Sequence, residues 1–263
     1  MKRLFKKWIE CVAVMLAVAV FSCFFPILRG QVCAESWEVV SAYTTYFDEK
    51  QAGRSENIRI AAKLLDGITL QAYGEFSFNQ TVGRRTAEAG FQQAKIISGG
   101  EYVLGTGGGV CQVSTTLYNA ALKSGLCITE FHPHSLQVGY VAPSRDAMVS
   151  TQSDLKLYNP HSYPLRLCIN VQNGVLRVQF LGKKENVRYE ICTEIIGEIA
   201  PPPPIVKEGD KEDVLREPKN GVKSRAYLEI YRGNSLLSRT HLRTDEYRPI
   251  QGIIVKKMPV ESD

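Results

Sequence analysis

Apolar and polar residues follow two different periods along the chain, and each period predicts one kind of element. Alternation of period two, rich in β-branched and aromatic residues, predicts strands over 41–47, 68–78, 94–98, 102–104, 136–141, 147–149, 154–159, 163–171 and 175–181. A period near 3.6 predicts a helix over 55–67 and a second one that starts near Cys111 and stops at Gly125. The polar run 79–86 is interpreted as a loop, and Asn173-Gly174 predicts a type I′ hairpin turn.

The C-terminal third has a different composition. Four prolines at 201–204 and the charged stretch 207–217 predict a linker over residues 199–220. Residues 221–263 return to period-two alternation around the turn Arg232-Gly-Asn234. The whole pattern predicts an α+β fold with a mostly antiparallel sheet and a few helices over residues 35–198, followed by a small C-terminal β-rich appendage.

Residues 1–34 are typical of an export segment, either a signal peptide or a membrane anchor. Four basic residues within the first seven precede an apolar run over 11–28. Pro26, Arg29 and Gly30 break a helix where a signal peptide would end, which favours cleavage over anchoring, whereas Val32 argues against lipoprotein processing at Cys33. We therefore expect an extracytoplasmic protein, secreted or membrane-anchored at the cell envelope, which meets the membrane only through this segment if it is uncleaved.

Charge excludes one class of partner. The 263 residues include 32 basic and 27 acidic ones, and the basic start accounts for part of the excess. No basic face for nucleic acid is indicated. Of seven cysteines, Cys111, Cys127, Cys168 and Cys192 lie in the body of the chain. Two disulfides are possible outside the cytosol, but we predict that all of these except Cys111 are buried structural thiols.

Cys111 stands where a glycine loop, Gly107-Gly-Gly109, meets a helix start. The unpaired amides and the dipole of a helix N-terminus favour a thiolate, which is the nucleophilic form. Backbone amides near Gly108, Gly109 and Gln112 could hold the oxyanion of an attacked carbonyl. The alternative is that Cys111 is a small buried hydrophobe that closes a turn.

His132 and His134 provide two candidate bases for that thiol. Imidazole has a suitable pKa, and a strand of about ten residues after the helix can return a histidine to the start of the helix. Either Asp146 or Asp154 could orient the histidine. A zinc site built from Cys111, His132 and His134 lacks a fourth ligand at a convincing spacing, so we predict neither a metal nor a cofactor.

Further polar residues are candidates for substrate binding. Arg84 and Arg85 follow a glycine and suit bidentate capture of a carboxylate, although a solvated turn explains them equally well. Ser114 and Thr115 either hydrogen-bond substrate or cap the helix, and the second role is favoured. Ser135, which follows His134, completes the set of candidates.

The motif Gly107-Gly-Gly-Val-Cys-Gln-Val-Ser-Thr-Thr-Leu-Tyr-Asn-Ala resembles the signature of the VanW-type domain family, named for an accessory protein of vancomycin-resistance clusters. The resemblance extends over about residues 41–181, through 74–79, 82–86, 90–91, Ala94, 132–135, 146–147 and 154–155. It implies an extracytoplasmic cell-wall protein. Some members are L,D-transpeptidases that cross-link peptidoglycan through a cysteine, which the motif aligns with Cys111.

The ending, residues 247–255, resembles the extension that often follows this domain and, weakly, G5-type modules. Together these observations predict a cysteine-dependent L,D-transpeptidase that acts on peptidoglycan stem peptides. Two alternatives stay open: a non-catalytic peptidoglycan-binding or vancomycin-resistance accessory protein, and a stem-peptide carboxypeptidase.

Overall fold

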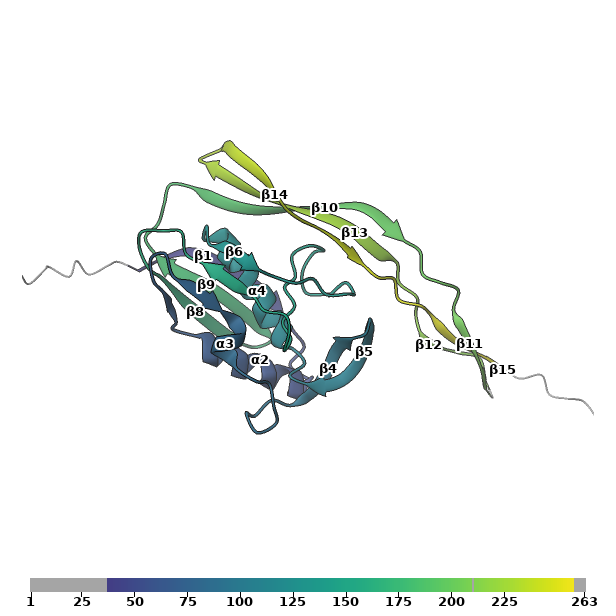
Figure 1. The fold of residues 1–263 in the computed structure, drawn as a ribbon. Helices are drawn as coiled ribbons and strands as arrows, with labels where there is room; N and C mark the ends of the chain where they lie inside the picture. Colours follow the sequence, from purple (N-terminus) through teal and green to yellow (C-terminus); the bar gives the residue numbers. More distant parts are fainter. Residues whose placement is uncertain (1–36, 210, 258–263) are drawn as a thin grey trace, which may run out of the picture. The chain divides into compact units, whose positions relative to one another are not determined.

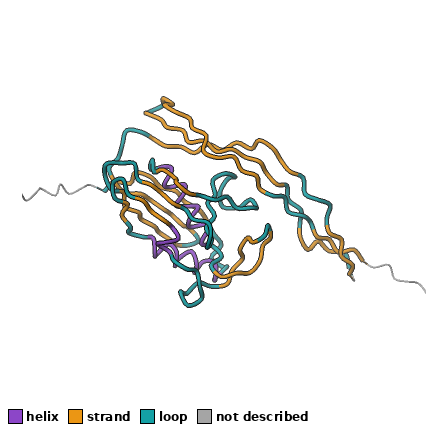
Figure 2. The backbone as a smooth tube through the Cα atoms, viewed as in Figure 1, coloured by secondary structure: helices purple, strands orange, loops and turns teal. Residues whose placement is uncertain are grey.

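The computed structural model of the protein describes residues 37–209 and 211–257, so the predicted export segment lies outside the described residues. Strands dominate this part of the chain, most of them antiparallel, and the helices are few (Figures 1 and 2). The predicted α+β class is therefore confirmed. None of the helices described is long and apolar enough to cross a membrane.

A four-stranded antiparallel sheet forms the base of the domain. Its strands are β1 (Glu38–Tyr46), β9 (Val175–Gly182), β8 (Leu165–Gln172) and β2 (Thr69–Leu70), in that order across the sheet. Asn173 and Gly174 both have positive φ, at 52° and 71°, between β8 and β9. The predicted hairpin turn is thus confirmed, because a type I′ turn needs positive φ at both central residues.

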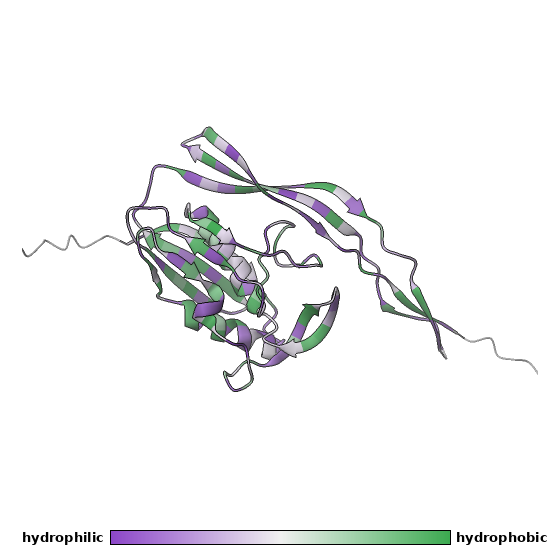
Figure 3. Cartoon of the chain, in the orientation of Figure 1, coloured by the Kyte–Doolittle hydropathy of each residue, from purple (hydrophilic) through white to green (hydrophobic). Residues whose placement is uncertain are grey.

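Two helices pack on one face of this sheet, α2 (Ala52–Leu65) and α4 (Val110–Lys123). On β8 and β9, Leu165, Leu167, Leu176, Val178 and Phe180 are buried, whereas the residues between them are more exposed. This alternation is visible as bands of colour along the strands (Figure 3). It is the pattern of an antiparallel sheet with one face in the core.

The helix predicted over 55–67 begins earlier than expected. α2 starts at Ala52, so Ser55 is buried within the helix and does not begin it. The hydroxyl of Ser55 points back to the carbonyl oxygens of Asp48 and Glu49, at 3.5 and 3.4 Å. The predicted helix after the glycine loop is confirmed, with Gly125 at a φ of 76° just beyond its end.

Smaller elements surround this core. The strand predicted over 68–78 is instead broken into β2 and β3 (Glu75–Ser77), because the chain turns at Tyr73 with a φ of 58°. The polar segment 79–86 is not all loop, since α3 (Phe78–Val82) occupies its start, with Ser77 as the cap. A second sheet has the order β3-β7-β6, in which β6 spans Cys127–Glu130 and β7 spans Lys156–Tyr158. The strands predicted over 94–98 and 102–104 are confirmed as β4 (Gln93–Ser98) and β5 (Glu101–Thr106), which pair as a hairpin.

The strands predicted over 136–141 and 147–149 are absent from the described structure. Leu136 and Val138 are buried as the alternation required, yet their segment forms no ladder. The backbone of 145–147 bonds instead to side chains of α4, which takes the place of strand pairing.

The C-terminal residues form two further three-stranded sheets. One has the order β10-β13-β14, from Arg188–Ile199, Gly221–Arg232 and Ser235–Tyr247. The other has the order β11-β15-β12, from Ile205–Gly209, Ile253–Lys257 and Asp213–Arg216. The range 199–220 therefore holds two short strands in addition to its prolines.

Candidate active site

Cys111 is the second residue of α4 and is partly exposed. The glycine loop before it is held by Asn57 of α2, whose Nδ2 donates to the carbonyl oxygen of Gly108 at 2.9 Å. A side chain at Gly108 would come within 2.7 Å of a backbone oxygen of β4, and Gly109 has a φ of 110°. Both positions therefore require glycine, and together they fix the turn that presents the thiol.

Some backbone amides at this turn donate hydrogen bonds within the protein, and others have no acceptor. The N–H groups of Val110 and Gln112 donate to the carbonyl oxygens of Gly107 and Gly109, at 3.1 and 2.9 Å. Within the described residues, no acceptor is present for the N–H groups of Gly108, Gly109 and Cys111. Of the amides predicted from the sequence, only that of Gln112 is therefore unavailable to an oxyanion.

His134 is the histidine that reaches Cys111. Its Nδ1 lies 2.7 Å from Oδ2 of Asp146, and its backbone N–H donates to the same oxygen at 2.7 Å. Because Nδ1 is occupied, Nε2 is the nitrogen left to interact with the thiol. The thiol form of Cys111 also donates to the carbonyl oxygen of Val149 at 3.4 Å. Cysteine, histidine and aspartate thus form a connected line.

The pKa values of these three groups favour an ion pair. Burial lowers the pKa of His134, but its hydrogen bonds to Asp146 and Cys111 outweigh this effect and raise the pKa to about 9. Burial raises the pKa of Cys111, but the hydrogen bond and charge of His134, followed by the Val149 backbone and Arg85, lower it overall. Both shifts favour a thiolate beside an imidazolium, which is the reactive form of a nucleophilic cysteine.

A row of buried polar side chains on α4 holds the loop that carries Asp146. Ser114 Oγ donates to the carbonyl oxygen of Ala147 at 2.6 Å, and Thr115 Oγ1 accepts from its N–H at 2.9 Å. Asn119 Nδ2 donates to the carbonyl oxygen of Arg145 at 2.7 Å. Ser114 and Thr115 therefore position the aspartate. The predicted capping role is wrong, because both lie within α4 and its N-cap is Gly109.

Strand β14 also contacts Asp146, which the sequence did not indicate. Tyr247, only 1% exposed, donates its hydroxyl to Oδ1 of Asp146 and accepts from the N–H of Ser144 at 2.7 Å. Arg243, 4% exposed, donates to the carbonyl oxygen of Asp146 at 2.6 Å and forms an ion pair with Asp245. No local motif marks these residues, because their role depends on a contact between distant parts of the chain.

Two arginines and a tyrosine lie close to Cys111. Arg54, which lies on α2, and Arg85 both interact electrostatically with Cys111. Tyr140 lies beside Arg54, whose guanidinium is 5.9 Å from the centre of the Tyr140 ring. Burial raises the pKa of Tyr140, and the charge of Cys111 raises it further. Arg85 is a predicted residue, whereas Arg54 and Tyr140 were not predicted.

Three other predicted residues lie away from the thiol. His132 pairs through Nε2 with Glu130 at 3.0 Å. Asp154 accepts from the Ser77 hydroxyl at 2.5 Å and from the amides of Asn79 and Leu155, so it organises the start of α3. Arg84 is exposed and has no hydrogen-bond or ion-pair partner in the described part of the chain. The structure thus groups His134 and Asp146 with Cys111 and leaves out the competing candidates.

The remaining candidates have structural contacts. Gln112 is buried, and its Nε2 donates to Thr45 Oγ1 at 2.9 Å and to the Tyr46 carbonyl oxygen at 3.0 Å. Ser135 accepts from the N–H of Arg248 through its carbonyl oxygen at 2.8 Å. All four cysteines of the described chain are free, and no disulfide joins any two of them. Cys127 is exposed, and Cys168 and Cys192 are only partly buried, which corrects the prediction that these three thiols are buried.

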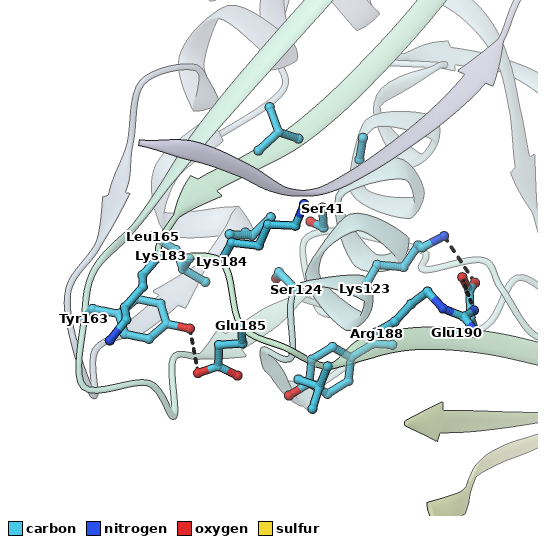
Figure 4. Close-up of a pocket in the computed structure, with 15 residues that line it drawn as sticks. Ser41, Lys123, Ser124, Tyr163, Leu165, Lys183, Lys184, Glu185, Arg188 and Glu190 are labelled. Atoms are coloured by element: carbon cyan, nitrogen blue, oxygen red, sulfur yellow. Dashed lines mark hydrogen bonds and ion pairs between the residues drawn. The ribbon is translucent and has the colours of Figure 1, made fainter. Parts of the chain in front are cut away.

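A pocket of about 390 Å³ lies elsewhere, beside the C-terminal end of α4 (Figure 4). Lys123, Ser124, Tyr163 and Glu185 are among its lining residues, and Figure 4 shows Tyr163 bonded to Glu185 and Lys123 paired with Glu190. Cys111 and Lys123 stand at opposite ends of α4, which at 1.5 Å per residue separates them by about 18 Å. This pocket is therefore not part of the cysteine site.

The fold and the site define an α+β domain with a Cys–His–Asp arrangement at the start of its central helix. Residues 53–181 match the family model described as VanW like protein. This part of the chain is therefore a VanW-like domain, which confirms the resemblance seen in the motifs.

Two curated proteins are similar to part of this chain. "Uncharacterized protein YoaR" of Bacillus subtilis is 42% identical over 131 residues, covering 49% of this chain and 43% of that protein. "Vancomycin B-type resistance protein VanW" of Enterococcus faecalis is 23% identical over 150 residues, covering 54% of each. The chain thus spans about half the length of the curated relatives it matches.

One solved structure, the crystal structure of HP0197-G5, aligns with 26% of this chain and 97% of its own chain. The identity is 19% and the TM-score is 0.14. A TM-score this low establishes no common fold.

Proposed function

We propose that this protein is a cysteine acyltransferase that acts on peptidoglycan stem peptides, as an L,D-transpeptidase does. The observation that carries the proposal is the line from Cys111 through His134 to Asp146, in which Asp146 holds Nδ1 at 2.7 Å. A buried carboxylate that fixes the tautomer of a histidine beside a nucleophile is the common plan of acyl-transfer sites.

The first half-reaction makes a thioester. The Cys111 thiolate attacks the carbonyl carbon of the third stem residue, and the amides of Gly109 and Cys111 hold the oxyanion. The bond to the nitrogen of the terminal D-alanine then breaks. The His134 imidazolium gives its proton to that nitrogen, so D-alanine leaves as an amine and His134 becomes neutral.

The second half-reaction restores the enzyme. An amine of a neighbouring stem attacks the thioester carbonyl, and neutral His134 accepts the proton that this nitrogen loses. The carbon–sulfur bond breaks, the acyl group remains on the new amide, and the thiolate–imidazolium pair forms again. With water in place of the amine, the same steps would make a carboxypeptidase.

The assignment to the cell wall rests on the family. One relative carries the name of a vancomycin resistance protein, and vancomycin resistance concerns stem peptides, which supports this substrate class. An extracytoplasmic location remains part of the proposal, through the export segment at 1–34. Fractionation of cells that express the full chain tests it, and recovery in the cytoplasm would contradict it.

The experiment is to incubate the full chain with tetrapeptide-containing muropeptides and to analyse the products by mass spectrometry. We expect loss of D-alanine and new dimers. Cys111→Ala should abolish both, whereas Cys127→Ala, which removes an exposed thiol on β6, should change neither. Loss of D-alanine without dimers would indicate a carboxypeptidase. Binding without turnover in the wild-type protein would refute catalysis and favour an accessory binding role.

A further inference from the structure

Two guanidinium groups converge near Cys111 from separate elements. Arg54 lies on α2 and donates from Nη2 to Oε1 of Gln112 at 2.5 Å, beside the Tyr140 ring. Arg85 follows α3 and donates from Nη1 to the carbonyl oxygen of Ser150 at 3.2 Å and from Nη2 to Asn79 Oδ1. Both side chains are partly buried.

Neither arginine has an acidic partner. Among the described residues, no carboxylate lies within ion-pair distance of Arg54 or Arg85, although exposed arginines such as Arg59, Arg188 and Arg239 do have such partners. In addition, Nε of Arg85 is buried without any hydrogen-bond partner in the described structure. The Cys111 thiolate is then the charge that the two arginines share, and two partly buried guanidinium groups without a carboxylate in ion-pair contact are typical of a site that receives an anion.

We propose that Arg54 and Arg85 form an anion subsite that binds a carboxylate of the acyl donor next to Cys111. This inference rests on the proposed function, because it names the chemical group by which the donor is held. The free carboxylate of the departing D-alanine, or a side-chain carboxylate of the third stem residue, would supply the anion. Arg54 is thus a substrate-binding residue that lies outside the predicted set.

The test compares two alkylating agents that differ in charge. Iodoacetate carries a carboxylate and iodoacetamide does not, yet both react with the same thiolate. The ratio of their rates at Cys111 therefore cancels any change in the thiolate population. We expect this ratio to exceed that at the exposed Cys127 of the same molecules by about tenfold, as for electrostatically focused sites, and to fall in high salt.

Substitution then assigns the effect to the arginines. Arg54→Gln and Arg85→Gln should each reduce the ratio at Cys111 several-fold. Arg84→Gln removes the same charge from the adjacent, exposed position and should leave the ratio unchanged. Arg54→Lys, which keeps the charge but not the bidentate fork, should have an intermediate ratio. An unchanged ratio in a folded Arg54→Gln variant, with its wild-type melting temperature, would overturn the proposal.

A second comparison separates this proposal from the proposed function. The donor tetrapeptide is offered with free carboxylates, with its terminal carboxylate amidated, or with its side-chain carboxylate amidated. Loss of turnover with one amide identifies the carboxylate that is bound. Equal turnover of all three, if abolished by Cys111→Ala, would refute the subsite while the acyltransferase stands. Selective iodoacetate labelling without any turnover would support the subsite and refute the enzyme.

Discussion

Replacement of Asp146 by asparagine isolates the electrostatic basis of the site. Asparagine keeps the size of the side chain and removes the charge that faces His134 Nδ1 at 2.7 Å. The imidazolium is almost fully buried, with 5% exposure of His134, so that its desolvation cost remains after the change. The pKa of His134 should therefore fall, and the pKa of Cys111 should rise because the thiolate loses its cationic partner.

The size of the effect follows from the pKa of His134. Its increase from 6.5 to about 9 corresponds to ~3 kcal/mol in favour of the imidazolium, since one pKa unit is worth about 1.4 kcal/mol. Asp146 and Cys111 share this stabilisation. If Asp146 supplies roughly half, the thiolate pKa rises by about one unit, and alkylation at pH 6 slows by roughly tenfold.

The assay is the pH dependence of iodoacetamide labelling, read for each cysteine by mass spectrometry. In the wild-type protein, Cys111 should label faster than the other three thiols near pH 7, and its rate should decline only at lower pH. The exposed Cys127 provides an internal reference. Asp213→Asn, at an exposed position on β12, is the matched control for loss of one negative charge.

Two results would refute the reasoning. An Asp146→Asn protein that keeps its melting temperature and the wild-type profile would mean that Asp146 does not tune the thiolate. Labelling of all four wild-type thiols at similar rates would mean that Cys111 is not activated at all.

Three further outcomes are expected. Tyr247→Phe leaves the Ser144 amide and Oδ1 of Asp146 without their hydroxyl partner. It should lower the free energy of unfolding, measured by urea titration, by ~1–3 kcal/mol. An unchanged midpoint would contradict the contact. Gly109→Ala forces a side chain into a φ of 110° and to 2.9 Å from the Arg54 carbonyl oxygen, and should cost ~1–3 kcal/mol, whereas Gly139→Ala has open space around it and should cost less. Glu130 has a pKa lowered from 4.5 to about 2 by its hydrogen bonds to Lys156, His132 and the Asp154 backbone. Its contribution to stability is therefore present above pH 4.5 and lost as the pH falls toward 2. Glu130→Gln should flatten that part of an acid denaturation curve followed by circular dichroism. An equally steep curve would argue against the effect.

The nucleophile and its helix could be predicted because their signals are local. Consecutive glycines allow only a sharp turn, and the apolar period after Cys111 fixes the helix direction within a few residues. The choice between His132 and His134 could not be made in this way. Both flank Pro133, and only the packing of the segment decides which ring turns toward the helix.

Long-range partners escaped prediction for a different reason. Arg54, Arg243 and Tyr247 have no distinctive neighbours in the sequence, and their roles arise where α2 and β14 meet the loop around Cys111. Strand predictions failed over 136–141 although the burial of Leu136 and Val138 was foreseen. Periodicity reports which side chains are buried, but it does not say whether neighbouring backbone groups bond to a strand or to side chains of a helix.

The hydrogen bonds from β14 to Asp146 have a consequence for the synthesis of the chain. During translation, Cys111, His134 and Asp146 are synthesised well before Arg243 and Tyr247. During that interval the aspartate loop lacks the contacts that Arg243 and Tyr247 make with it. The polar contacts around Asp146 are therefore complete only when β14 has been made.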